Sequence, residues 1–133
     1  PFEDDSSTTE QSGDSSPEIG TVNLIVGSDR SLDESGLATL LGVVVEAKAA
    51  TLQQLTGFSG TTSDAVIVGT NRRGEPSTFA GSATRVGDAV RAAVRDAVRE
   101  GLAIRYTNTD VPDSVDEADS GIVTDRSATV FEL

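Results

Sequence analysis

Polar segments alternate with apolar runs along the chain, and the spacing of the runs predicts strands and helices. Residues 20–27, GTVNLIVG, contain three consecutive apolar side chains and predict a buried strand. The apolar run at 65–70 predicts a second strand. Residues 71–76, NRRGEP, are typical of a turn, so a short strand at 77–80 would complete a hairpin.

Two helices are predicted between these strands. The residues SLDE match a capping box, with Ser31 as the N-cap and Glu34 three residues later, and they predict a helix that runs to about Leu41. Gly42 and the β-branched valines after it separate this helix from a second one. We expect the second helix to end at Gly57, because glycine is common just after a helix C-terminus.

A third and longer helix is predicted over residues 81–102. Apolar residues recur there at four-residue spacing, and arginine, aspartate and glutamate occupy the other faces. Ser82 or Thr84 is the expected N-cap. The apolar positions are Val86, Val90, Val94, Val98 and Leu102.

The alternation of strands and helices predicts an α/β fold, a layered sandwich with two to three packed helices. The expected hairpin at 64–80 implies a mixed sheet. Residues 1–18 have too few apolar side chains to fold and predict a disordered acidic linker. Residues 19–133 are expected to form a single α/β domain, with an acidic loop at about 107–120. Residues 121–133 predict two further short strands.

Charge is unevenly distributed and excludes some partners. The net charge is −12, and residues 1–19 and 110–120 carry six and five acids with no base. The segment between them is balanced, so no net basic surface is available for nucleic acid or anionic lipid. No apolar run approaches the roughly 20 residues that cross a bilayer, and no signal-peptide pattern is present. We therefore expect a cytoplasmic protein with no nucleic-acid or membrane partner.

The missing residue types restrict the chemistry. The chain has no histidine and no cysteine, which removes the usual general base, the commonest metal ligand and thiolate chemistry. Catalysis would use carboxylates, hydroxyls, the lysine or backbone amides, and we expect no metal and no required cofactor. Nine arginines against one lysine favour a salt-adapted source. Because no methionine occurs, we also expect the chain to begin inside a larger gene product.

The stretch GTTSD, which ends at Asp64, is the first candidate site. Two interpretations remain open: a turn whose hydroxyls bond nearby amides, or an active site at the end of a strand. In the second, Asp64 acts as a general base or orients water. Thr61 or Thr62 would bind a substrate amide or act as the nucleophile, with Asp64 or Lys48 as its base.

Lys48 is the only lysine and stands among small or apolar neighbours. Its ammonium either reaches solvent along a helix surface or binds an anionic group in a cleft. Glu46 lies two residues away, where it would face elsewhere on a helix, and a structural role is expected for it. Thr21 and Asn23 are placed near the same sheet edge, where a polar side chain needs a partner.

The residues GSAT, at 81–84, open the long helix. One interpretation is capping alone. In the other, the free amides at the positive helix end form a cradle for an oxyanion or a phosphate. The glycine spacing fits neither a P-loop nor a dinucleotide-binding fingerprint.

Four segments in compact order, GTVNLIV, EAKAATLQQL, GTTSDAVIV and FAGSATRVGDAVRAAVRDAV, resemble the adenosylcobinamide amidohydrolase family of archaeal corrinoid salvage. The resemblance covers roughly residues 19–104. It implies hydrolysis of the amide that joins aminopropanol to the corrin ring, giving adenosylcobyric acid. The family-like positions are Gly20, Thr21, Asn23, Glu46, Ala47, Lys48, Thr61, Thr62, Asp64, Gly81, Thr84 and Gly87.

The resemblance also implies a corrinoid substrate and a preceding half domain, which would make this chain the C-terminal part of a larger domain. A missing N-terminal half or a second copy is the expected partner. The alternatives are a non-catalytic corrinoid-binding module and a half domain that needs a partner segment. Asp64, Lys48 and Thr62 are the predicted catalytic residues, with Lys48 and the amides at 81–84 stabilising the oxyanion. The predicted substrate-binding residues are Thr21, Asn23, Glu46, Thr61, Gly81, Ser82 and Thr84.

Overall fold

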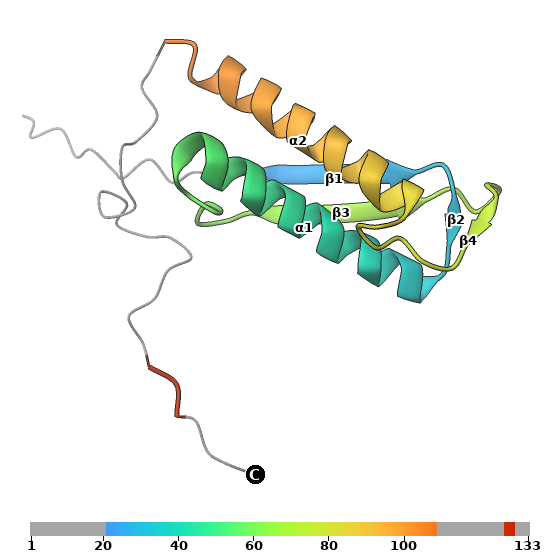
Figure 1. Ribbon diagram of the computed structural model, residues 1–133. Coiled ribbons are helices and arrows are strands. Elements are labelled where there is room, and N and C mark those ends of the chain that lie inside the picture. Colours follow the sequence, from blue (N-terminus) through green and yellow to red (C-terminus); the bar gives the residue numbers. More distant parts are fainter. Residues whose placement is uncertain (1–20, 109–126, 130–133) are drawn as a thin grey trace, which may run out of the picture.

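A computed structural model describes residues 21–108 and 127–129. In Figure 1 the two helices lie together in front of a small parallel sheet. The α/β layered class is therefore confirmed. The elements, in chain order, are β1 (Asn23–Ser28), β2 (Ser31–Leu32), α1 (Glu34–Thr56), β3 (Ala65–Thr70), β4 (Pro76–Ser77) and α2 (Arg85–Arg105).

Every strand pairing in the described part of the chain is parallel. β1 pairs with β3 in the register Asn23 to Ala65 through Ser28 to Thr70. β2 pairs with β4. The expected hairpin and the mixed sheet it implied are therefore wrong. Helix α1 returns the chain to the amino end of β1, so β3 runs in the same direction as β1, as a helical crossover requires.

Helix α1 is continuous, which corrects the prediction of two helices separated by Gly42. The N-cap is Asp33, whose carboxylate accepts a hydrogen bond from the Gly36 amide at 2.7 Å, and not Ser31, which belongs to β2. Leu40 and Val44 on either side of the glycine are fully buried, so tertiary packing overrides the local helix-breaking tendency. The predicted end is confirmed: Gly57 caps the helix in the left-handed conformation, with φ of 80°.

By length and composition alone, α1 would also pass as a membrane span, with a mean hydropathy of 1.4. This corrects the expectation that no segment approaches that length. The feature is weak support for a span, because the core helix of a folded domain passes the same test. One side of α1 packs against α2 and β3, where its buried residues include Leu40, Val44 and Leu52.

Helix α2 confirms the four-residue apolar spacing. Val90, Val94 and Val98 are buried, while the charged residues between them are exposed. Thr84 is the N-cap, as one of the two predicted alternatives, and its hydroxyl accepts from the Gly87 amide at 3.0 Å. The core consists of side chains from both helices, from Leu32 of β2 and from Ala80. Its buried members are Leu32, Leu40, Val43, Val44, Ala47, Leu52, Ala80, Val90, Val94 and Val98.

Several predicted features lie outside the described residues. These are the linker at 1–18, nearly all of the acidic loop at 107–120, and most of the two strands expected within 121–133. Residues 127–129 are described, and they are exposed and belong to no strand.

Two glycines of α2 give a matched test of how its first turn packs. A Cβ on Gly87 would lie 2.1 Å from the Gly81 carbonyl oxygen, which is backbone and cannot move aside easily. We expect Gly87→Ala to lower the free energy of unfolding by about 1–3 kcal/mol. Urea denaturation followed by circular dichroism measures the change.

The control is Gly101→Ala in the same helix, where an added Cβ meets nothing within 4 Å. Alanine is the better helix former, so this variant should gain up to about 1 kcal/mol. Equal effects of the two substitutions would contradict the close packing of the first turn of α2 on Gly81.

Candidate active site at the amino ends of the parallel strands

A buried carboxylate organises the amino end of the parallel sheet. Asp64 stands immediately before β3, and each of its two carboxylate oxygens accepts two hydrogen bonds. The backbone amides of Val22 and Thr61 donate to it at 2.9 and 3.0 Å. The Lys48 ammonium and the Thr61 hydroxyl are its other donors. All the acceptor positions of this carboxylate are therefore occupied.

These donors come from three different elements. Val22 leads into β1, Lys48 belongs to the buried side of α1, and Thr61 lies in the loop that connects α1 to β3. The side chains of Lys48 and Asp64 are only 8% and 11% exposed. The pair therefore fixes the helix and both strands to one another. A charge at either position depends on its partner, because an unpaired charge is costly to bury.

The electrostatic environment keeps Asp64 ionised. Burial raises the pKa of Asp64, but the hydrogen bonds from Lys48, Thr61 and the Val22 amide together lower the pKa below its ordinary value of 3.8. Such a carboxylate is a weak base at neutral pH, since a general base works best with a pKa near the operating pH. Asp64 is therefore suited to holding neighbouring groups in position.

This lowered pKa has a consequence for stability in acid. The unfolded chain binds the Asp64 proton more readily than the folded chain, so the contribution of Asp64 is complete above 3.8 and is lost as the pH falls through the folded value. We expect the free energy of unfolding to fall below about pH 4 more steeply for the native sequence than for Asp64→Asn. Urea denaturation at a series of pH values tests this. Equal slopes for the two proteins would contradict it.

Two hydroxyls lie beside this cluster at the surface. Thr21 Oγ1 and Ser63 Oγ are 2.5 Å apart, and both residues are exposed. Asn23 Oδ1 accepts from the Ala65 amide at 3.2 Å. The structure thus brings Thr21 and Asn23 to the same end of the sheet as Asp64. The exposed hydroxyls of Thr21 and Ser63 are donors and acceptors of the kind that hold an amide group.

Thr61 and Thr62 are distinguished by the structure. The Thr61 hydroxyl and amide both bond to Asp64, and Thr61 is half-buried. Thr62 is exposed in the adjoining turn. The Thr61 hydroxyl, one of the two candidate nucleophiles, is therefore oriented by a carboxylate, and the catalytic role of Thr62 stays a prediction.

Four other predicted site residues lie elsewhere. Glu46 is exposed on α1. Gly81, Ser82 and Thr84 precede α2, which begins at the opposite end of the sheet, beside β2 and β4 (Figure 1). Lys48 instead pairs with Asp64 just before β3, and the joint action of Lys48 and the amides at 81–84 on one oxyanion stays a prediction.

The Thr84 hydroxyl is already engaged in local structure. It donates to the Gly81 carbonyl oxygen at 2.7 Å and accepts from the Gly87 amide. These two bonds close the turn before α2 and cap its first turn. These bonds match the interpretation in which the residues at 81–84 cap the helix.

Two members of the cluster at Asp64 were not predicted from the sequence. One is the Val22 backbone amide, which carries no side-chain signal. The other is Ser63, whose hydroxyl meets Thr21. The signal for Ser63 was its place within GTTSD, but a serine in a turn-like stretch is too common to single out.

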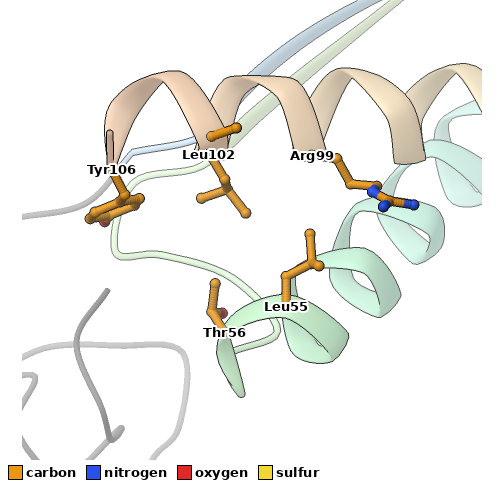
Figure 2. Close-up of a pocket in the computed structure, with 6 residues that line it drawn as sticks. Leu55, Thr56, Arg99, Leu102 and Tyr106 are labelled. Atoms are coloured by element: carbon orange, nitrogen blue, oxygen red, sulfur yellow. The ribbon is translucent and has the colours of Figure 1, made fainter. Parts of the chain in front are cut away.

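No candidate metal centre occurs among residues 21–108 and 127–129, since these contain no group of three or more side chains suited to holding an ion. That no metal or cofactor is required stays a prediction. A shallow, mostly apolar hollow of about 270 Å³ lies between the last turns of α1 and α2 (Figure 2). None of the predicted site residues lines it. Its lining residues are Leu55, Thr56, Arg99, Leu102, Ala103 and Tyr106.

Comparison with known proteins identifies the class to which this α/β chain belongs. Residues 3–110 match the family described as adenosylcobinamide amidohydrolase, and the chain belongs to that family. The match contains every residue of the Asp64 cluster. It begins within the segment that the sequence predicted to be a linker and extends beyond the resemblance drawn at 19–104.

A curated protein of Halobacterium salinarum (strain ATCC 700922 / JCM 11081 / NRC-1), named adenosylcobinamide amidohydrolase, is a relative of this chain. It is 51% identical to this chain over 112 residues, which cover 84% of the chain and 48% of the relative. The chain thus spans about half the length of the curated relative it matches. No solved structure matches the chain.

Proposed function

We propose that this chain is part of an enzyme that hydrolyses the aminopropanol amide of adenosylcobinamide to give adenosylcobyric acid in corrinoid salvage. The observation that carries the proposal is the family match over residues 3–110. The name of the Halobacterium salinarum relative supports it. In the reaction, water cleaves the bond between the amide carbonyl carbon and nitrogen, leaving a carboxylic acid on the corrinoid and releasing the amine.

Within this chain, the cluster around Asp64 is the proposed contact with the amide. The half-buried Thr61 hydroxyl is held by Asp64, and the exposed hydroxyls of Thr21 and Ser63 lie at the same end of the sheet. We assign contact with the substrate amide to Thr61. Asp64 and Lys48 are positioning residues, because the carboxylate has a lowered pKa and a full set of donors.

The working enzyme is proposed to be longer than this chain. The chain covers only 48% of its relative, so the other groups that the reaction requires are assigned to the remaining part or to a second copy. The Halobacterium salinarum relative also supports the proposed salt-adapted, archaeal source, and the cytoplasmic location stays a prediction.

Release of the amine tests the proposed function. The full-length gene product is incubated with adenosylcobinamide, and free aminopropanol is measured with an amine-reactive reagent. The expected result is one aminopropanol for each corrinoid converted. Retention of the corrinoid on the protein without amine release would instead favour a non-catalytic corrinoid-binding module.

A further inference from the structure

Among the residues that the structure describes, both helices lie on one side of the β1–β3 sheet, and no helix or strand covers its other side (Figure 1). Along each strand the residues alternate between half-buried and exposed. The apolar half-buried ones, Leu24, Val26, Val66 and Val68, pack against the core. Those on the other face are paired across the strands as Asn23 with Ala65, Ile25 with Ile67, and Gly27 with Gly69.

This face is apolar at its centre. Ile25 is 82% exposed and Ile67 is 60% exposed, and they are register partners. No charged residue belongs to the six positions on this face. Two isoleucines side by side on an exposed sheet are unfavourable in water, because their apolar surface is stabilised by burial.

The glycine pair at the carboxyl end of the same face leaves the backbone open. A Cβ added to Gly27 or Gly69 would meet nothing within 4 Å. A covering segment could therefore approach the strands closely there. In addition, each of these two strands has a single neighbour in the described part of the chain, so each has an open edge.

Parallel sheets occur almost only with both faces covered, and two strands alone are marginal in water. The curated relative contains slightly more than half of its length outside the match, whereas only 16% of this chain lies outside it, from the 84% that matches. The part of this chain outside the match is thus too short to account for the rest of the relative. The unmatched half of the relative is large enough to cover the open face of the sheet.

We propose that the open face of β1 and β3 is the docking surface for the remaining half of the full-length protein, which covers Ile25 and Ile67 with an apolar layer. The occupant is thus a segment of the same polypeptide. This inference concerns assembly, so it stands or fails independently of the amidohydrolase activity.

Cysteine accessibility tests the proposal, since these 133 residues contain no cysteine. Ile67→Cys is introduced into the full-length protein and its alkylation is followed by mass spectrometry of the peptide that contains residue 67. Ala93→Cys, at an exposed position on the charged α2, is the matched control. We expect residue 67 to react roughly tenfold or more slowly than residue 93 in the native state, and equally fast in denaturant.

Two results would overturn the proposal. Equal native rates at residues 67 and 93 would mean that the face is open in the full-length protein. Protection that disappears on dilution would assign the face to a second copy instead of the same polypeptide. Because Ile67→Cys replaces an exposed side chain with a smaller one, folding of the variant can be checked independently by circular dichroism.

Discussion

Replacing Asp64 with asparagine will lower the free energy of unfolding by about 3 kcal/mol, because the Lys48 ammonium then stays buried without a counter-charge. The asparagine amide keeps the shape of the side chain, so the change isolates the charge. Both side chains of the pair are at most 11% exposed, so solvent cannot replace the lost interaction. Urea denaturation of the two proteins at neutral pH measures the difference.

The control for this prediction is an ion pair on the surface. Asp96 accepts from Arg95 at 2.8 Å, but their side chains are 62% and 52% exposed. Asp96→Asn should therefore leave stability unchanged within the error of the method. If Asp64→Asn behaved like Asp96→Asn, the buried pair would have no role in holding α1 against the strands.

A double-mutant cycle separates the pair from its surroundings. Lys48→Met removes the ammonium but keeps an apolar stem of similar length. The combined variant Lys48→Met/Asp64→Asn contains no buried charge, so it should be more stable than the sum of the single losses predicts. Simple additivity would contradict the direct coupling of the two side chains.

Replacing Thr61 with alanine will reduce turnover of adenosylcobinamide by the full-length protein roughly 10²–10³-fold, a loss typical of removing one polar group that acts on the reacting amide. The reason is the position of the Thr61 hydroxyl, which Asp64 holds at the accessible side of the buried pair. Thr61→Ser keeps a hydroxyl and should retain much more activity. Initial rates at saturating substrate measure the effect.

Thr62→Ala is the matched control because it removes the same group from the next residue of the same loop. Thr62 is exposed, whereas the hydroxyl and amide that are seen to bond to Asp64 belong to the half-buried Thr61. We expect Thr62→Ala to retain most of the native turnover. A larger loss for Thr62→Ala than for Thr61→Ala would instead favour Thr62 as the threonine that acts on the amide.

The elements with strong local signals were predictable from the sequence. The valines of α2 repeat at helical spacing, and Val90, Val94 and Val98 form its buried side. Both the helix and its buried side therefore followed from the pattern. Gly57 and Thr84 were also predictable, because a left-handed cap and a hydroxyl N-cap are local requirements. The strands at 23–28 and 65–70 also followed from their apolar runs, but the prediction that the first is buried is wrong, because the residues of both strands alternate between exposed and half-buried.

The errors arose where non-local contacts decided the structure. Ser31 and Asp33 compete as caps, and the pairing of Ser31 with Pro76 from a distant segment leaves Asp33 to cap α1. Gly42 was interpreted as a break because the burial of Leu40 and Val44 on either side of it depends on contacts with distant elements. The direction of β3 depends on the path of α1, which no turn motif encodes.

The candidate site shows the same division. Lys48 and Asp64 were selected individually from their composition and position, and the structure pairs them. Their separation of 16 residues places them on different elements, so no sequence motif reveals the pair. The residues at 81–84 were grouped with them by chemistry alone, and only the fold shows that they belong to the other end of the sheet.

The most direct test of the proposed function follows the oxygen of water into the corrinoid. The full-length protein is incubated with adenosylcobinamide in water enriched in heavy oxygen, and the corrinoid is analysed by mass spectrometry. Hydrolysis predicts adenosylcobyric acid with one heavy oxygen in its new carboxyl group. Unchanged adenosylcobinamide, under conditions in which the protein is folded, would contradict the assignment.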